Sequence, residues 1–323
     1  MRNIWLVSGV LTLLACGQGT DPSSPGGSGP GGNPPGGDPG LGPNVSLNGW
    51  RPFPNDNPWN TPVDGSPVDP NSARIIGSIG LDDPLHPDFG TEPTYGIPYI
   101  VVSGSTPRVP VSFDYDDESD PGPYPLPRDA PIEGGAGSDG DRHVLVLDQD
   151  NKMLYELWDA HPGSSGWTAG SGAIFDLTSN ALRPAGWTSA DAAGLPVFPG
   201  LVRYDEVAAG EIRHAIRFTV RRSRRAYILP ARHWASSSTN DSLPPMGMRV
   251  RLKAGFDISG FPPQARVILQ AFKTYGMILA DNGSDWFFSG TSDPNWDDDQ
   301  LNTLKGLRGR DFEVVQMGTL VTP

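Results

Sequence analysis

Two residues of one predicted hairpin, a histidine and a glutamate, are the first candidates for catalysis. Apolar strand-like segments flank a polar turn at residues 149–152. If Asp148 pairs with Met153 across this turn, His143 and Glu156 lie on the same face of the hairpin, because side chains alternate along a strand. A histidine beside a carboxylate can transfer protons near neutral pH. We therefore expect His143 and Glu156 to form a general acid–base pair, within reach of each other and open to a cleft.

Neighbours of this pair are candidates for substrate binding. Trp158 shares the predicted face, and Arg142 precedes His143. His214 lies in a strand-like segment, and His233 follows a basic stretch. An aromatic face can stack on a sugar ring, while guanidinium and imidazole groups can hydrogen-bond to it. The alternative for each histidine is a structural role.

A second candidate site follows a buried strand-like segment in the C-terminal part of the chain. Asp281 and Asp285 flank an Asn-Gly pair, and Trp286 comes next. The catalytic interpretation places both carboxylates at the rim of a cleft, with Trp286 as a platform for a sugar ring. The structural interpretation is a tight hairpin connection, because Asn-Gly favours such turns.

Two clusters of like charge each have a binding and a structural interpretation. The acidic run Asp114–Asp120 either holds Ca²⁺ through its carboxylate oxygens or is solvated in a loop, and it lacks the spacing of an EF-hand. The basic run Arg221–Arg225 either binds an acidic polymer or is a solvated turn between strands. Apart from the calcium alternative, we expect no metal and no cofactor.

The elements that position these residues are short strands separated by turns. The chain has 41 glycines and 35 prolines, which interrupt helices and punctuate strands. Residues 166–210 are dense in them and predict a long irregular segment over one face of a sheet. One clear helix is expected from Pro262 to a stop at Gly276. The pattern predicts a β-rich α+β fold, an antiparallel, jelly-roll-like β-sandwich with a few peripheral helices.

The N-terminus predicts secretion and lipid attachment. A short basic start and an apolar run at residues 4–14 end in the sequence LLAC, which resembles the lipobox of bacterial lipoproteins. The resemblance implies that residues 1–15 are removed as a signal peptide and that Cys16 is lipidated. Gly17 after the cysteine implies sorting to the outer membrane of a bacterial cell envelope.

The rest of the chain divides into a tether and one domain. Residues 16–44 are rich in glycine and proline and predict a disordered tether. Residues 45–323 are long enough to bury a core and predict a single extracytoplasmic domain. No later apolar stretch reaches the length of a transmembrane span, so we expect the lipid on Cys16 to be the contact with the membrane. We also expect the protein to be a monomer.

The composition excludes several classes of function. A net charge of −13 is the opposite of the basic footprint of a nucleic-acid-binding protein. Cys16 is the only cysteine, so lipidation leaves no thiolate for catalysis and none for a zinc ribbon. The GxSxG, HExxH, P-loop and GxGxxG signatures are absent from the sequence.

Long strings in the body carry a further resemblance, among them PFPNDNPWN, DRHVLVLD with LYELWDA, and YGMILADNGSDW. From about Phe53 to Val315 the chain resembles a group of secreted, mostly bacterial proteins with no established activity. The resemblance implies a single secreted domain and no mechanism.

Three functions remain open on the sequence alone. The first is an enzyme that cleaves extracellular polysaccharide by hydrolysis or β-elimination. The second is a non-catalytic lipoprotein that binds glycans in the same cleft, and the third is a structural lipoprotein whose tryptophans all lie in the core. The first two predict a concave site lined by polar groups with at least two exposed tryptophans, and the third predicts none.

Overall fold

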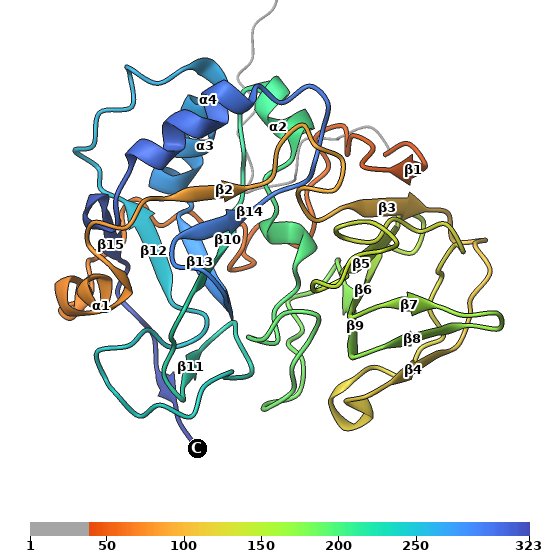
Figure 1. Ribbon diagram of the computed structural model, residues 1–323. Helices are drawn as coiled ribbons and strands as arrows, with labels where there is room; N and C mark the ends of the chain where they lie inside the picture. Colours follow the sequence, from red (N-terminus) through yellow and green to blue (C-terminus); the bar gives the residue numbers. More distant parts are fainter. Residues whose placement is uncertain (1–38) are drawn as a thin grey trace, which may run out of the picture. The chain divides into compact units, whose positions relative to one another are not determined.

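The computed structural model describes residues 39–323, and the predicted hairpin lies inside a five-stranded sheet (Figure 1). Its strands lie in the order β1 (Gly42–Pro43), β3 (Tyr99–Val102), β5 (Val144–Asp148), β6 (Met153–Trp158) and β9 (Ser171–Asp176). Asp148 pairs with Met153 and Leu145 with Glu156, so the predicted register of the hairpin is confirmed. β9 extends the antiparallel ladder within a segment predicted to be irregular.

A six-stranded sheet carries the C-terminal half of the chain. Its strands lie in the order β15 (Phe312–Val314), β12 (Arg249–Leu252), β13 (Met277–Asn282), β10 (Ile216–Val220), β14 (Phe287–Ser289) and β2 (His86–Asp88). The β-rich α+β class predicted from the sequence is confirmed. The pairing departs from a purely antiparallel sandwich, since β10–β13, β14–β2 and β3–β5 are parallel pairs. Parallel neighbours need crossover connections, which the hairpin signals in the sequence do not reveal.

Two smaller sheets and short helices complete the fold. β4 (Val111–Phe113), β8 (Trp167–Ala169) and β7 (His161–Pro162) form one small sheet, and β11 (Tyr227–Ile228) pairs with β16 (Leu320–Val321). The α-helices are α1 (Ser72–Ile79), α2 (Tyr204–Ala209), α3 (Pro263–Thr274) and α4 (Asp298–Thr303). The 3₁₀ helices are η1 (Asp116–Glu118), η2 (Phe198–Gly200), η3 (Leu304–Gly306) and η4 (Gly309–Asp311).

Alternating side chains of the five-stranded sheet enter two different cores. Leu145 and Leu154 belong to the main core, which also contains Phe218 and Leu279 of the six-stranded sheet. Side chains of the opposite face pack instead against the small β4–β8–β7 sheet. They include Val144, Val146, Tyr155 and Leu157. This two-sided burial explains why β5 is buried along its whole length and apolar from Val144 to Leu147.

Helix α3 follows the predicted pattern closely. It begins at Pro263, where a missing N–H costs nothing, and Gly276 just beyond it has φ +68°. Its Phe272 ring contacts Phe288 of β14 and Phe312 of β15, at centroid distances of 5.1 and 6.0 Å. The helix therefore covers the six-stranded sheet on its core side (Figure 1).

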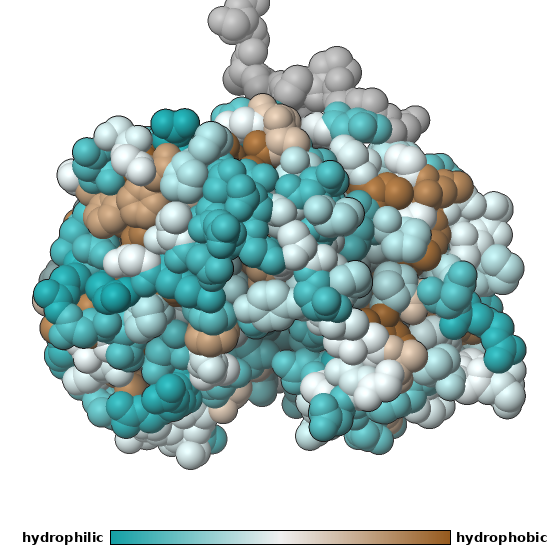
Figure 2. All heavy atoms as spheres, turned by 45° about the horizontal axis from the view of Figure 1, so that its top comes forward, coloured by the Kyte–Doolittle hydropathy of each residue, from teal (hydrophilic) through white to brown (hydrophobic). Residues whose placement is uncertain are grey.

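The predicted tether and anchor fall mostly outside the described residues. Cys16 and the signal peptide lie there, and so does most of the segment 16–44. Gly42 and Pro43, predicted as tether, pair with Val101 and Ile100 of β3, so the ordered body starts slightly earlier than Val45. Among residues 39–323, no helix combines the length and apolar character needed to cross a membrane. The face shown in Figure 2 is mostly hydrophilic, with apolar residues in separate patches.

Candidate functional site

A cavity of about 390 Å³ opens where the two large sheets meet the segment between β9 and η2. One wall comes from the end of β6, the start of β9 and the loops near them, and another from the end of β13. The lining residues are Tyr115, Glu118, Asp141, Trp158, Ser171, Thr188, Ser189, Ala190, Asp191, Ala192, His233, Asp281 and Asn282. Three predicted site residues, Trp158, His233 and Asp281, are thus brought together from distant parts of the chain.

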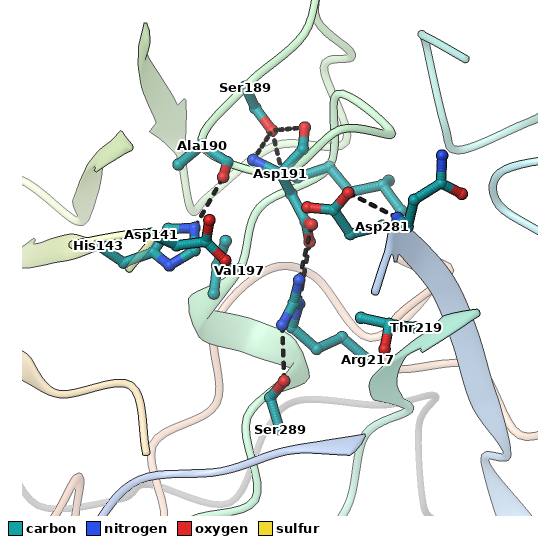
Figure 3. Close-up of polar contacts among 12 residues, drawn as sticks. Asp141, His143, Ser189, Ala190, Asp191, Val197, Arg217, Thr219, Asp281 and Ser289 are labelled. Carbon is teal, nitrogen blue, oxygen red and sulfur yellow. Dashed lines mark hydrogen bonds and ion pairs between the residues drawn. The ribbon is translucent and has the colours of Figure 1, made fainter. Parts of the chain in front are cut away.

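The carboxylate of Asp191 is a buried charge in the cavity lining that is held by an ion pair. It is 1% exposed and accepts hydrogen bonds from Arg217 Nε at 3.0 Å and Nη2 at 2.7 Å (Figure 3). Arg217 comes from β10 and also donates to Ser289 Oγ of β14 at 2.6 Å. Burial lowers the pKa of Arg217, but the Asp191 charge more than offsets this, so the pKa stays above its ordinary value. Asp191 is therefore a fixed anion with its counter-ion behind it.

Asp281 lies next to this ion pair and behaves differently (Figure 3). It is half-buried at the end of β13, accepts the Asn282 N–H at 2.6 Å and lies beside the Asp191 carboxylate. Burial, and next the negative charge of Asp191, raise the pKa of Asp281 to about 7. Two adjacent carboxyl groups cannot both ionise easily, so one keeps a proton. Asp281 can therefore donate or accept a proton near neutral pH.

His143 is buried beneath the cavity and does not line it. Nδ1 lies 2.5 Å from Glu133 Oε2 and Nε2 lies 2.9 Å from the carbonyl oxygen of Ala190. Since both partners are acceptors, both ring nitrogens must donate, which is the protonated imidazolium form. Burial lowers the pKa of His143, but Glu133 outweighs it and the pKa rises to about 9. A charged histidine that is 2% exposed positions the Ala190 segment rather than acting as a base in an open cleft.

Glu156 shares the predicted face of the hairpin but is also fully buried. Its carboxylate accepts the Val197 N–H at 2.9 and 3.0 Å and the Phe198 N–H at 2.8 Å. Burial raises the pKa of Glu156 to about 7, although these amides lower it. Both members of the predicted acid–base pair therefore hold the backbone that carries Asp191, and neither reaches the cavity surface.

Arg142 and His214 were predicted to bind substrate, but their side chains are buried and hydrogen-bond to other groups of the protein. Arg142 is buried and donates to the carbonyl oxygens of Ala160, Ala136 and Ser138, which fixes the loop before β5. His214 is buried with Nε2 3.0 Å from Glu206 and Nδ1 2.8 Å from the carbonyl oxygen of Ala215. A histidine or arginine within an apolar strand pattern gives no sign of which backbone groups will satisfy it.

Trp286 and Asp285 also lie outside the cavity. Trp286 is fully buried, donates from Nε1 to the Gly80 carbonyl at 3.0 Å and stacks on Phe218 and Phe312. It is a core residue and not a sugar platform. Asp285 accepts the Arg221 N–H at 2.7 Å, as a turn residue does.

Trp158 and Tyr115 form an aromatic wall of the cavity. Their ring centroids are 6.3 Å apart, Trp158 is half-buried and Tyr115 is 53% exposed. Trp158 Nε1 donates to Asp141 Oδ1 at 3.2 Å, which places a carboxylate at the edge of the wall. His233 adds an imidazole, held by a 2.8 Å contact between Nδ1 and the Ala192 carbonyl oxygen. At least two exposed tryptophans were expected of a glycan site, whereas this lining has one tryptophan, Trp158, which is half-buried beside the exposed Tyr115.

The acidic run Asp114–Asp120 attaches this region to the rest of the fold. Glu118 accepts the Thr188 N–H at 3.0 Å, and Asp120 forms an ion pair with Arg183 and accepts the Ile174 N–H. Groups of the protein therefore already occupy two of its carboxylates.

A different group of three potential metal ligands occurs among residues 39–323. The ligand atoms of Glu133, Asp141 and His143 lie within 4.8 Å of one another. Glu133 and His143 already satisfy each other, so this group can be explained as an ion pair beside a carboxylate.

The sequence interpretation missed Asp191 and Arg217. A signal existed for Arg217, since a charged residue inside the strand IRFTV must find a partner if its face is buried. Asp191 lies in an irregular segment between β9 and η2, where no periodicity marks a buried residue. Only tertiary structure brings it to Arg217.

A larger cavity of about 560 Å³ offers less chemistry. Prolines are frequent in its lining, and its charged side chains are Arg128, Asp129 and Asp293. None of these three is buried. The smaller cavity therefore remains the candidate site, because buried and perturbed carboxyl groups mark functional sites.

Comparison with known proteins adds no assignment to these residues. No protein-family profile, no curated protein and no solved structure matches this chain. The geometry and charge of the cavity are therefore the guide to its function.

Proposed function

We propose that the protein is a cell-envelope lipoprotein that hydrolyses polysaccharide, with Asp281 as the acid–base residue. The observation that carries the proposal is the Asp281 carboxyl, which lines a cavity beside the fixed anion Asp191 and has a pKa of about 7. Enzymes tune carboxyl groups in this way when a proton must be donated near neutral pH. The aromatic wall of Trp158 and Tyr115 beside it supports a sugar as the ligand.

The chemistry needs one proton donor and one proton acceptor. Asp281 gives its proton to the glycosidic oxygen as the bond to the anomeric carbon breaks. Water adds its oxygen to that carbon and loses a proton to a carboxylate, for which Asp141 and Glu118 on the lining are candidates. Exchange with solvent then returns each carboxyl group to its starting form. Burial and the neighbouring charge of Asp191 favour the protonated form of Asp281.

The charges of the cavity favour hydrolysis over β-elimination. A lyase acting on uronates must neutralise the substrate carboxylate to make the neighbouring proton acidic. The lining has four carboxyl groups and no lysine or arginine. Arg217 lies behind Asp191 and is already paired with it.

A non-catalytic glycan-binding lipoprotein is the second candidate, supported by the same aromatic wall. The hydrolase and the binding protein differ in whether the protein releases products from a polysaccharide. Full-length protein would be incubated with a panel of neutral, amino and acidic polysaccharides, and new reducing ends and product masses would be measured.

The decisive variant is Asp281→Asn at the end of β13, with Asp285→Asn in the connection from β13 to β14 as its matched control. We expect Asp281→Asn to lower kcat by about 10²-fold or more, the usual contribution of a general acid, and Asp285→Asn to stay within about twofold. Equal activity of both variants would exclude Asp281 as the acid. Glycan binding by the wild type without any product would replace the hydrolase by the binding protein.

A further inference from the structure

We infer that the cavity selects glycans with free amino groups, as in unacetylated 2-amino sugars. This inference rests on the proposed role of the cavity as a glycan site and names the class of sugar. It is carried by two carboxylates, Asp141 and Glu118, that form no ion pair with lysine or arginine among the described residues and that line the same cavity as the aromatic wall.

The charges around the cavity do not cancel. Arg217 neutralises Asp191, and the His143–Glu133 ion pair is neutral as a unit. Asp141 and Glu118 remain, and within residues 39–323 neither forms an ion pair with lysine or arginine. Asp141 is exposed and Glu118 is half-buried, so both can meet a ligand in the cavity. An ammonium group would supply the missing positive charge.

The aromatic wall strengthens the case for a cation. The faces of tryptophan and tyrosine attract ammonium groups, and the attraction grows when water is excluded. Trp158 holds Asp141 through its indole N–H, and Glu118 follows Tyr115 closely through the single turn of η1. The Trp158 ring therefore has a carboxylate beside it, and the Glu118 carboxylate lines the same cavity as Tyr115. Aromatic faces combined with carboxylates recognise amines better than hydroxyl groups.

An uncompensated acceptor lies in the same lining. Asn282 donates from Nδ2 to the Ala235 carbonyl at 3.1 Å, while its Oδ1 is buried and has no hydrogen-bond partner among the described residues. The lining therefore offers acceptors in excess of donors. An N-acetyl group would remove the positive charge of the sugar, and a uronate would add a negative one, so both should bind less well than the free amine.

The test compares matched oligosaccharides on the full chain. Calorimetric titration at about pH 6 would use a glucosamine tetramer, its N-acetylated counterpart and a glucose tetramer. We expect the glucosamine tetramer to bind about tenfold more tightly than the other two. Asp141→Asn should remove most of this preference and leave the affinity for the glucose tetramer within about twofold, while Asp139→Asn in the same loop should change nothing.

The outcomes separate this inference from the proposed function. Equal affinity for the free and acetylated tetramers, or an equal loss for both in Asp141→Asn, would overturn the amine preference. Asp281-dependent cleavage of a neutral polymer with no amine preference would leave the hydrolase standing and refute the inference. Tight binding of the glucosamine tetramer without cleavage of any polymer would uphold the inference and refute the hydrolase.

Discussion

The guanidinium of Arg217 spans both carboxylate oxygens of Asp191, with Nε–Oδ2 and Nη2–Oδ1 distances of 3.0 and 2.7 Å. The pair joins β10 of the six-stranded sheet to the irregular segment that lines the cavity. Asp191 is 1% and Arg217 is 4% exposed, so removing either partner would leave the other charge buried without solvent or a counter-ion. A buried pair of this kind fixes geometry, and the loss of one partner is costly.

We therefore expect Arg217→Met to lower the free energy of unfolding by about 3–5 kcal/mol, because it leaves the Asp191 carboxylate buried without a counter-ion. The double variant Asp191→Asn/Arg217→Met should be less destabilised than Arg217→Met alone. Urea unfolding measures both. If the double variant were less stable than Arg217→Met, the unpaired Asp191 carboxylate would not be the main cause of the destabilisation.

Two fully buried groups contribute to the pH dependence of stability. Burial raises the pKa of Glu156 from 4.5 to about 7, and Glu133 raises that of His143 from 6.5 to about 9 against the opposing effect of burial. A raised pKa in the folded state gives stability that is present below the unfolded pKa and is lost as the pH rises through the folded pKa. Thermal stability should therefore fall between about pH 5 and pH 9. Glu133 and Glu206 have lowered pKa values, so they affect stability only at more acidic pH.

Glu156→Gln isolates one part of this effect. Glutamine keeps an acceptor for the Val197 and Phe198 amides but does not titrate. The wild type should lose on the order of 2 kcal/mol more than this variant between pH 5 and pH 8, since one pKa unit corresponds to about 1.4 kcal/mol. Melting temperatures across this range provide the comparison. Parallel curves for the two proteins would exclude Glu156 as the source of the slope.

Activity should follow the protonation of Asp281. With a pKa of about 7, the carboxyl is mostly protonated below that pH and loses its proton above it. As a general acid it must be protonated, so kcat/KM should fall about tenfold per pH unit above pH 7. Initial rates on a cleaved polymer measure this profile. A flat profile up to pH 9 would argue against Asp281 as the proton donor.

Substitution of Trp286 should affect stability, whereas substitution of Trp158 should affect ligand binding. Trp286→Ala should lower the free energy of unfolding by about 3–5 kcal/mol, because it empties a core site between Phe218 and Phe312. Trp158→Ala removes a half-buried wall residue and should cost much less stability, but it should weaken glycan binding by about tenfold. Urea unfolding and titration together test the contrast. Equal loss of stability in both variants would make Trp158 a core residue.

Cys16→Ser tests the predicted anchor. The variant should leave the membrane fraction, or accumulate as an uncleaved precursor, because serine offers no sulfur for lipid attachment. Fractionation followed by mass spectrometry of the N-terminus distinguishes these results from the wild type. Normal processing and continued sedimentation with membranes would disprove the lipid anchor.

Local patterns predicted the parts of the fold that local forces determine. The β5–β6 register follows from the turn and from alternation, and α3 follows from its prolines, its apolar stripe and Gly276. Trp158, His233 and Asp281, which the sequence analysis proposed as site residues, line one cavity. It could not show that Asp281 would meet Asp191, because that contact depends on the parallel pairing of β10 with β13 and on the path of an irregular segment.

The same limit explains the errors at His143 and Trp286. Alternation places His143 and Glu156 on one face, but it cannot show that the segment from Ala190 to Phe198 covers that face and supplies partners for both. Trp286 follows a turn signal and was expected at a rim. Its burial depends on Phe312, which comes from the end of the chain.

The parallel pairing of β10 with β13 also has a kinetic consequence. The strands are separated by β11, β12 and α3, so their pairing closes a long loop before it gains contacts. The carboxyl group of Asp281 meets Asp191 only after this closure. Recovery of ligand binding should therefore report the slowest step of refolding, later than the recovery of secondary structure, and a fragment that ends before β13 should have no cavity.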